Sequence, residues 1–125
     1  RINAYNILSD IRPVKNYPKD SDWVDMAIET FESAHPYKDN FTDTKTFTVP
    51  GAKYVRLKIK KYEIETGYDN LEIYSSTNDQ VEKITGAGEN AFSQYVDGDT
   101  LKVVFKTDNS VTKWGFVINE IQFIK

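Results

Sequence analysis

Alternation of apolar with basic or aromatic side chains in the segment Tyr54–Tyr62 is the feature of this chain that most restricts its fold. Val55, Leu57 and Ile59 occupy every second position, and the residues between them are basic or aromatic. A period of two is the pattern of a β-strand that has one buried face and one face in solvent. The segment therefore predicts a sheet whose apolar face must pack against a second layer.

Shorter segments with the same pattern recur along the chain, separated by turn-forming residues such as Pro50–Gly51 and Asp97–Gly98–Asp99. Frequent short strands divided by such turns are typical of an antiparallel sandwich. We therefore predict an all-β antiparallel β-sandwich of jelly-roll type. In chain order, the candidate strands are 28–33, 45–49, 54–62, 71–74, 81–84, 92–96, 100–107 and 114–124.

The last candidate strand needs an irregularity. Phe116 and Ile118 share one parity, whereas Ile121 and Phe123 have the other. A β-bulge near Asn119–Glu120 would bring all four side chains to the core side.

Composition excludes several classes of site and partner. The chain has 125 residues, one domain's worth, with no cysteine and one histidine, so disulfides, thiolate metal sites and cysteine nucleophiles are ruled out. A net charge of −3 argues against nucleic acid or an anionic membrane as the main partner. No apolar run approaches the roughly 20 residues that cross a bilayer.

The N-terminal part reads differently from the rest. Ile2, Tyr5 and Leu8 recur at helical spacing, and Pro13 would end any helix there. We expect residues 1–16 to be a short helical or extended arm, the tail of an upstream domain. Residues 17–27 have the composition of a linker, and residues 28–125 form the β-sandwich domain.

Two acidic turns carry the candidate chemistry, one between Glu63 and Asp69 and one at Thr107–Ser110. Loops at one end of a sandwich gather in space, and carboxylates that meet there repel one another unless a cation lies between them. Oxygen donors without cysteine favour Ca²⁺ over zinc or copper. Solvated carboxylates in exposed turns are the alternative interpretation of the same pattern.

At these residues the chain resembles the CUB domains, specifically the cysteine-free CUB-like type of bacterial secreted proteins. The resemblance covers roughly residues 28–125 and is most specific in the later segments. It rests on Ser33–Tyr37, Lys60–Glu65, Gly67–Tyr74, Val103–Ser110 and Trp114–Phe116.

This resemblance implies a Ca²⁺ site. Carried over by position, the acidic ligands are Glu65, Asp69 and Asp108, and a backbone carbonyl near Asn109 or Ser110 completes the shell. The chain departs from the animal pattern because it lacks cysteines and has a shorter acidic loop. Glu63 is therefore a rival of Glu65, and alternation places both on the same face.

A second resemblance lies at Arg1–Tyr5, which is similar to the closing helix of subtilisin-like peptidase domains. Together the two resemblances imply a secreted, non-catalytic accessory module of a subtilisin-like serine peptidase. It would contact the upstream peptidase domain or a protein substrate, bind neither nucleic acid nor membrane, and be monomeric as a fragment. His35 precedes Pro36 and no serine lies in a Gly-x-Ser-x-Gly context, so we expect a loop histidine rather than a catalytic one.

Two further sets of residues have both a functional and a structural interpretation. A basic stripe could bind an anionic partner or be the solvated face of a sheet; it comprises Tyr54, Arg56, Lys58, Lys60 and Tyr62. Scattered aromatic residues could line a sugar groove, which makes a carbohydrate-binding module of a secreted glycosidase the alternative function. They are Trp23, Tyr68, Tyr74, Tyr95 and Trp114, of which we expect Trp114 in the core and Trp23 at a contact with another domain.

Overall fold

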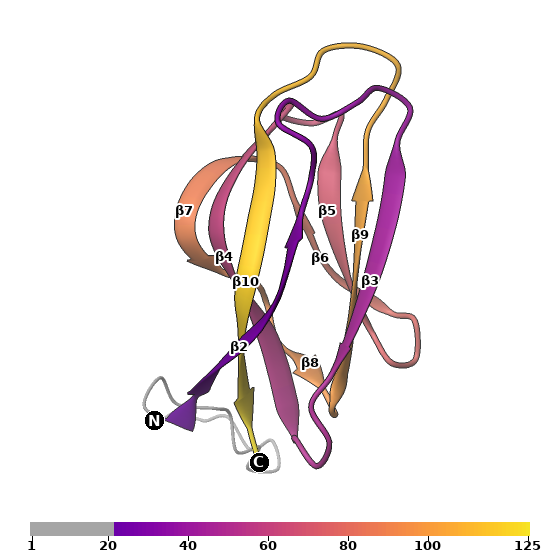
Figure 1. The fold of residues 1–125 in the computed structure, drawn as a ribbon. Coiled ribbons are helices and arrows are strands. Elements are labelled where there is room, and N and C mark those ends of the chain that lie inside the picture. Colours follow the sequence, from indigo (N-terminus) through magenta and orange to yellow (C-terminus); the bar gives the residue numbers. More distant parts are fainter. Residues whose placement is uncertain (1–21) are drawn as a thin grey trace, which may run out of the picture.

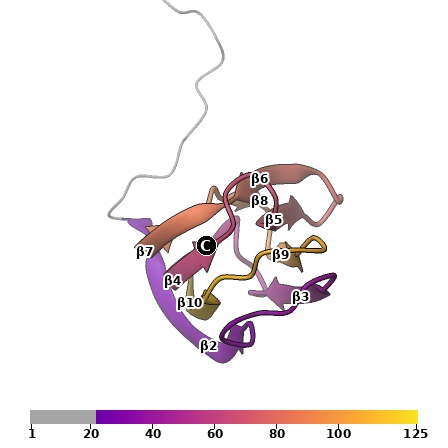
Figure 2. The same cartoon turned by 90° about the horizontal axis from the view of Figure 1, so that it is seen from above.

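The computed structural model describes residues 22–125, which form a two-layer antiparallel β-sandwich (Figures 1 and 2). The predicted all-β class is confirmed, whereas the expected arm at residues 1–16 lies outside the described residues. One sheet has the order β2 (Val24–Glu32), β10 (Gly115–Ile124), β4 (Tyr54–Ile64) and β7 (Gly86–Phe92), with the short β8 (Val96–Asp97) also paired to β4. The other has the order β3 (Thr42–Thr48), β9 (Thr100–Lys106), β5 (Asn70–Ser75) and β6 (Gln80–Ile84).

The core lies between the two sheets, as the alternation in β4 predicts. Val55, Leu57 and Ile59 are each 0% exposed. They share the core with residues of the second sheet that alternate in the same way, among them Leu71 and Phe105. Full burial of one such aliphatic side chain contributes roughly 1.5–3 kcal/mol, so this seam is the main source of the domain's stability.

A bulge in β10 confirms the irregularity that its parity change predicts. Ile118 pairs with Ile59, but Glu120 pairs with Lys58, so β10 has one extra residue, Asn119, at this step. Phe116, Ile118 and Ile121 are consequently fully buried, and Phe123 packs against the core while partly exposed.

A second bulge, in β4, corrects the predicted basic stripe. Lys61 pairs with Val117 and Ile59 pairs with Ile118, so Lys60 is the extra residue of β4. Beyond it the parity is reversed, and Tyr62 packs against the core instead of joining Arg56 on the outer face. The stripe as predicted is therefore wrong at its last member.

Strand β7 lies between the candidate strands 81–84 and 92–96, where no strand was predicted, and residues 93–95, expected in a strand, are irregular. Gly88 pairs with Tyr62 of β4, whose ring lies against it: a Cβ at position 88 would lie 2.7 Å from Tyr62 Cε1. The absence of a side chain at Gly88 thus lets β7 pair with β4 directly beside the inward-facing Tyr62.

The domain also starts earlier than expected. Strand β2 begins at Val24, inside the segment assigned to a linker, and pairs along β10 as the edge of the first sheet. Within residues 22–125 the structure contains no helix with the length and apolar character needed to span a bilayer.

Three loops that are distant in sequence lie at the same end of the sandwich, at the top of Figure 1. They connect β2 to β3, β4 to β5, and β9 to β10. The two acidic turns belong to the second and third of these loops, so the topology alone brings them to one end.

Candidate cation site

Backbone hydrogen bonds join the β2–β3 loop to the β9–β10 loop. The amide of Tyr37 donates to the carbonyl of Lys113 at 3.2 Å, and the amide of Asn40 donates to the carbonyl of Asp108 at 2.7 Å. The hydroxyl of Thr107 accepts from the amide of Phe41 at 2.8 Å. These contacts fix the position of Asp108 relative to the first loop.

The β4–β5 turn places Asp69 at the inner side of the same end. The carbonyl of Glu65 accepts from the amides of Tyr68 and Asp69 at 3.3 and 3.1 Å, which closes the turn. Gly67 adopts a φ of +83°, a left-handed conformation that glycine enters without steric cost. The Thr85 hydroxyl also donates to the Glu65 carbonyl at 3.0 Å, tying the turn to the β6–β7 connection.

The three acidic residues carried over from the family resemblance come together. One carboxylate oxygen from each of Glu65, Asp69 and Asp108 lies within 4.8 Å of the others. Asp69 is 0% exposed, and its Oδ1 accepts the amide of Asp108 at 2.8 Å. Asp69 is thus the innermost member of the cluster. Glu65 and Asp108 lie on its outer side, in the β4–β5 and β9–β10 loops.

Tyr37 is a member of this end that the sequence did not identify as a site residue. Its side chain is 3% exposed, and its hydroxyl donates to Asp69 Oδ2 at 2.7 Å while accepting the amide of Glu65 at 3.1 Å. Burial and the hydrogen bond to Asp69 raise the pKa of Tyr37 well above its usual range. The hydroxyl therefore remains protonated and orients the Asp69 carboxylate. Its place in the CUB-like segment Ser33–Tyr37 was the only sequence signal for it.

We expect Tyr37→Phe to lower the free energy of unfolding by about 1–3 kcal/mol, because the buried Asp69 carboxylate and the Glu65 amide would each lose a partner. Urea denaturation in the presence of EDTA measures this loss without any contribution from a bound cation. Tyr95→Phe is the control, since its ring packs edge-on against Tyr54 away from the cluster. Equal unfolding midpoints for the two variants would show that the Tyr37 hydroxyl does not stabilise Asp69.

Glu65 is electrostatically unfavourable in the protein alone. Its Oε1 is buried and has no hydrogen-bond partner within the described residues. Partial burial raises the pKa of the Glu65 carboxyl, and the negative charges of Asp108 and Asp69 raise it further. An unpartnered buried oxygen that faces two further carboxylates matches the donor set of a hard divalent cation such as Ca²⁺.

The remaining predicted ligands are distributed differently. Glu63 lies outside the cluster, on the outer side of β4, where its carboxylate is 3.7 Å from Lys61 Nζ. Ser110 donates its amide to Asp108 Oδ1 at 3.2 Å, and Asn109 is exposed in the same loop. A carbonyl ligand from Asn109 or Ser110 stays a prediction.

His35 lies in the β2–β3 loop and stacks on Trp114, with ring centroids 4.0 Å apart. Its Nδ1 is 2.7 Å from the carbonyl of Trp114, and its Nε2 is 2.8 Å from Glu32 Oε1. These two contacts and the stacking hold the His35 ring in this loop. Trp114 was expected in the core, but it is half-buried at this loop, because only the residues after it enter β10.

The basic residues of β4 make local contacts. The Arg56 guanidinium lies 4.2 Å from the ring centroids of Trp23 and Phe92, and Lys58 pairs with Glu120 at 2.9 Å. These contacts favour the solvated-face interpretation of the stripe. Trp23 packs against Arg56 and stays partly exposed, and its expected contact with another domain stays a prediction.

The aromatic residues considered for a sugar groove do not share one surface. Tyr68 is 67% exposed beside Asp69, whereas Tyr74, on the other sheet, donates its hydroxyl to Glu72. Tyr95 contacts the rings of Trp23 and Tyr54. A groove built from all of these residues is therefore excluded.

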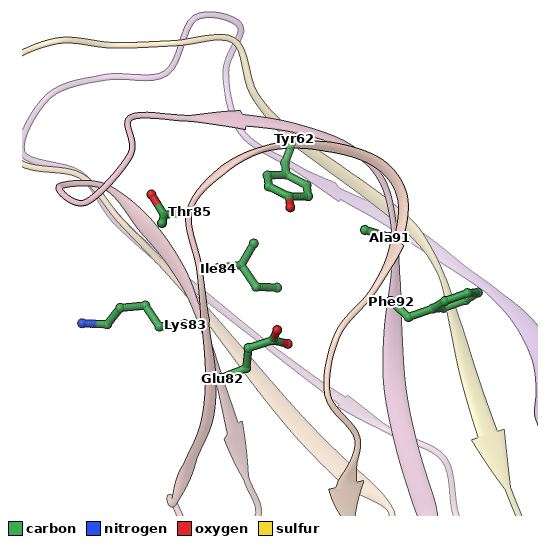
Figure 3. A pocket seen from close by; sticks show the side chains of 7 residues that line it. All are labelled: Tyr62, Glu82, Lys83, Ile84, Thr85, Ala91 and Phe92. Atoms are coloured by element: carbon green, nitrogen blue, oxygen red, sulfur yellow. The ribbon is translucent and has the colours of Figure 1, made fainter. Parts of the chain in front are cut away.

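A cleft of about 230 Å³ opens between β6 and β7, with Tyr62 and Ile84 at its centre (Figure 3). Its polar side chains are Glu82, Lys83 and Thr85, and Glu82 accepts the amide of Gln94 at 2.7 Å. The acidic cluster does not line this cleft. The cleft lies on the open flank of the sandwich, which is distinct from the loop end that carries the acidic cluster.

Comparisons with known proteins agree with this architecture. A family model described as "Uncharacterized protein E02H4.4 C-terminal domain" matches residues 13–122. The human zinc finger ZZ-type and EF-hand domain-containing protein 1 is 32% identical over 94 residues, which is 73% of this chain and 3% of that protein. The human E3 ubiquitin-protein ligase HERC2 is 32% identical over 88 residues, covering 68% of this chain and 2% of that protein. The chain therefore spans only a few per cent of the length of these relatives.

Two solved structures show the fold. The extracellular region of zebrafish Gpr126/Adgrg6 matches 78% of this chain and 14% of that chain, with a TM-score of 0.65 and 24% identity. The MASP-1 CUB2 domain bound to Ca²⁺ matches 77% of this chain and 90% of that chain, with a TM-score of 0.56 and 18% identity. The sandwich is thus CUB-like, and a CUB domain of similar fold has been crystallised with Ca²⁺.

Proposed function

We propose, given that the chain belongs to the E02H4.4 C-terminal domain family, that it is a non-catalytic CUB-like module that binds Ca²⁺ and contacts protein partners. The observation that carries the proposal is the convergence of Glu65, Asp69 and Asp108 within 4.8 Å. The unpartnered Glu65 Oε1 and the Ca²⁺ in the MASP-1 CUB2 domain support it.

Hydrogen bonds within the domain position the three carboxylates before a cation binds. Tyr37 orients Asp69 through its hydroxyl, and the amide of Asp108 fixes the other Asp69 oxygen. The turn after β4 then brings Glu65 opposite them. Ca²⁺, when bound, would supply the positive charge that offsets the mutual repulsion of the three carboxylates.

Contact with protein would use the same end of the sandwich. Tyr68 and Val111 are 67% and 53% exposed, and they lie in the loops that carry Asp69 and Asp108. A large exposed aromatic and an exposed aliphatic side chain on loops fixed by a cation form a preorganised contact surface. Fixing these loops before a partner arrives reduces the entropy lost on association.

An extracellular location is part of the proposal, supported by the two structural neighbours, one of which is an extracellular region. The subtilisin-like parent rests on Arg1–Tyr5, outside the described residues, and the named relatives are not peptidases by name. That parent and the bacterial type of the module stay predictions. Carbohydrate binding stays the alternative.

Isothermal titration calorimetry with CaCl₂ on Glu65→Gln and Glu63→Gln tests the ligand assignment. We expect Glu65→Gln to weaken Ca²⁺ binding at least about tenfold, or about 1.4 kcal/mol, because an anionic ligand is lost. Glu63→Gln is the matched control and should bind as the unmodified protein does, since Glu63 pairs with Lys61 outside the cluster. A larger effect of Glu63→Gln would contradict the assignment.

A further inference from the structure

A single sequon for N-linked glycosylation lies at the loop end of the sandwich. Among all asparagines of the chain, only Asn40 is followed two residues later by serine or threonine, in Asn40-Phe41-Thr42. The rule requires a residue other than proline between them, which Phe41 satisfies. Asn40 belongs to the turn that precedes β3, and both Asn40 and Thr42 are exposed.

The conformation of Asn40 leaves its side chain available. Its φ is +52°, a left-handed conformation that asparagine tolerates better than most residues. Its backbone amide donates to the Asp108 carbonyl at 2.7 Å, but within residues 22–125 its side-chain amide makes no hydrogen bond. A bulky substituent on Nδ2 would therefore break no contact that the described part of the chain makes.

The turn that carries Asn40 is firmly attached to the domain. The amide of Thr107 donates to the Phe41 carbonyl at 2.9 Å, and the Thr107 hydroxyl donates to the Lys38 carbonyl at 2.7 Å. The attachment point of a group on Asn40 would thus have a fixed position beside the loop that carries Asp108.

We propose that Asn40 is an acceptor of N-linked glycan. The C1–N bond forms at Asn40 Nδ2 as the C1–O bond of a lipid diphosphate-linked oligosaccharide breaks; the lipid diphosphate is the leaving group and the Nδ2 proton is released. The Thr42 hydroxyl completes the sequon. This proposal rests on the extracellular location included in the proposed function.

The position gives the glycan a physical role. Strand β3 is an edge of its sheet, with β9 on one side only, and it begins directly after the sequon at Thr42. A free edge exposes unpaired backbone groups that can recruit other strands. A hydrated saccharide at this point shields that edge and adds bulk on the Asp108 side of the acidic cluster, so a partner protein that contacts this end would approach from the side of Tyr68.

The test is secretion of the full chain behind a signal peptide from human cells, followed by intact mass measurement before and after peptide N-glycosidase treatment. We expect the enzyme to remove mass from the unmodified protein and from Thr42→Ser. Asn40→Gln and Thr42→Ala should show no such loss. Asn90→Gln should lose the same mass as the unmodified protein, because Asn90 is followed two residues later by Phe92 and lies outside any sequon.

A secreted, folded protein whose mass the enzyme leaves unchanged would overturn the proposal. A mass loss that persists in Asn40→Gln would overturn it as well. Calcium titration of the same samples separates this outcome from the proposed function. Calcium binding without a glycan refutes only the modification, and a glycan without calcium binding refutes only the cation site.

Discussion

Replacing Asp69 with asparagine is expected to abolish the calcium-dependent rise in thermal stability. A site occupied at 100 times its dissociation constant adds about 2.7 kcal/mol to folding. For a domain of this size, such a gain corresponds to a Tm shift on the order of 10 °C. Asp69 is the fully buried member of the cluster, and its two oxygens are already positioned by Tyr37 and by the Asp108 amide. Loss of its charge therefore removes the innermost anionic ligand.

Differential scanning calorimetry with 5 mM CaCl₂ or EDTA, concentrations of about the order that extracellular calcium modules require, measures this effect. Asp97→Asn is the control, because Asp97 is exposed on β8 and outside the cluster. A cooperative transition of Asp69→Asn in EDTA shows that the variant folds. If it still gains stability from calcium as the unmodified protein does, Asp69 is not a ligand.

Gly115→Ala is expected to destabilise the domain by about 3–5 kcal/mol, because the added Cβ would produce a severe steric conflict. Gly115 has a φ of +108°, and a Cβ there would lie 1.8 Å from Ser33 Oγ and 3.1 Å from the Ala34 carbonyl oxygen. Ser33 Oγ also accepts the amide of Phe116 at 3.1 Å. The β2–β3 loop, which carries Tyr37, would have to move away from β10.

Gly98→Ala separates steric conflict from backbone strain. Gly98 has a similar φ of +98°, but a Cβ there would have nothing within 4 Å. Its replacement should cost only the strain of a left-handed alanine, about 1 kcal/mol. Urea denaturation of both variants gives the two free energies, and equal losses would show that the contact with Ser33 is not what requires glycine at position 115.

The sequence predicted those parts of the fold in which apolar residues mark the buried face of a strand. In β4 the buried Val55, Leu57 and Ile59 mark one face, and in β10 the parity change of apolar residues marks the bulge at Asn119. The bulge at Lys60 is marked only by Ile64, which is buried at the opposite parity, because the residues between Ile59 and Ile64 are charged or aromatic and fit either face. Tyr62 was therefore assigned to the wrong side.

Strand β7 illustrates how tertiary pairing overrides local preference. Gly86, Ala87 and Gly88 have the composition of a turn, and no apolar alternation indicates a strand. They are extended because they pair with Ile64, Glu63 and Tyr62 of β4. Local sequence contains no information on that partner.

The acidic cluster was predicted from a resemblance rather than from spacing, and its details depended on local geometry. Alternation could not separate Glu63 from Glu65, since both have the same parity. The end of β4 at Ile64 separates them, because Glu63 is still in the strand beside Lys61 whereas Glu65 begins the turn. The role of Tyr37 depends on the path of a loop joined to Lys113 by its backbone, which no periodicity encodes.

The most direct test of the central claim is the melting temperature of the unmodified protein as calcium is titrated after EDTA treatment. Three converging carboxylates with an unpartnered Glu65 oxygen predict a saturable upward shift that excess EDTA reverses. Melting curves that superimpose at every calcium concentration would contradict the account, because a cation that relieved this repulsion would necessarily stabilise the folded state.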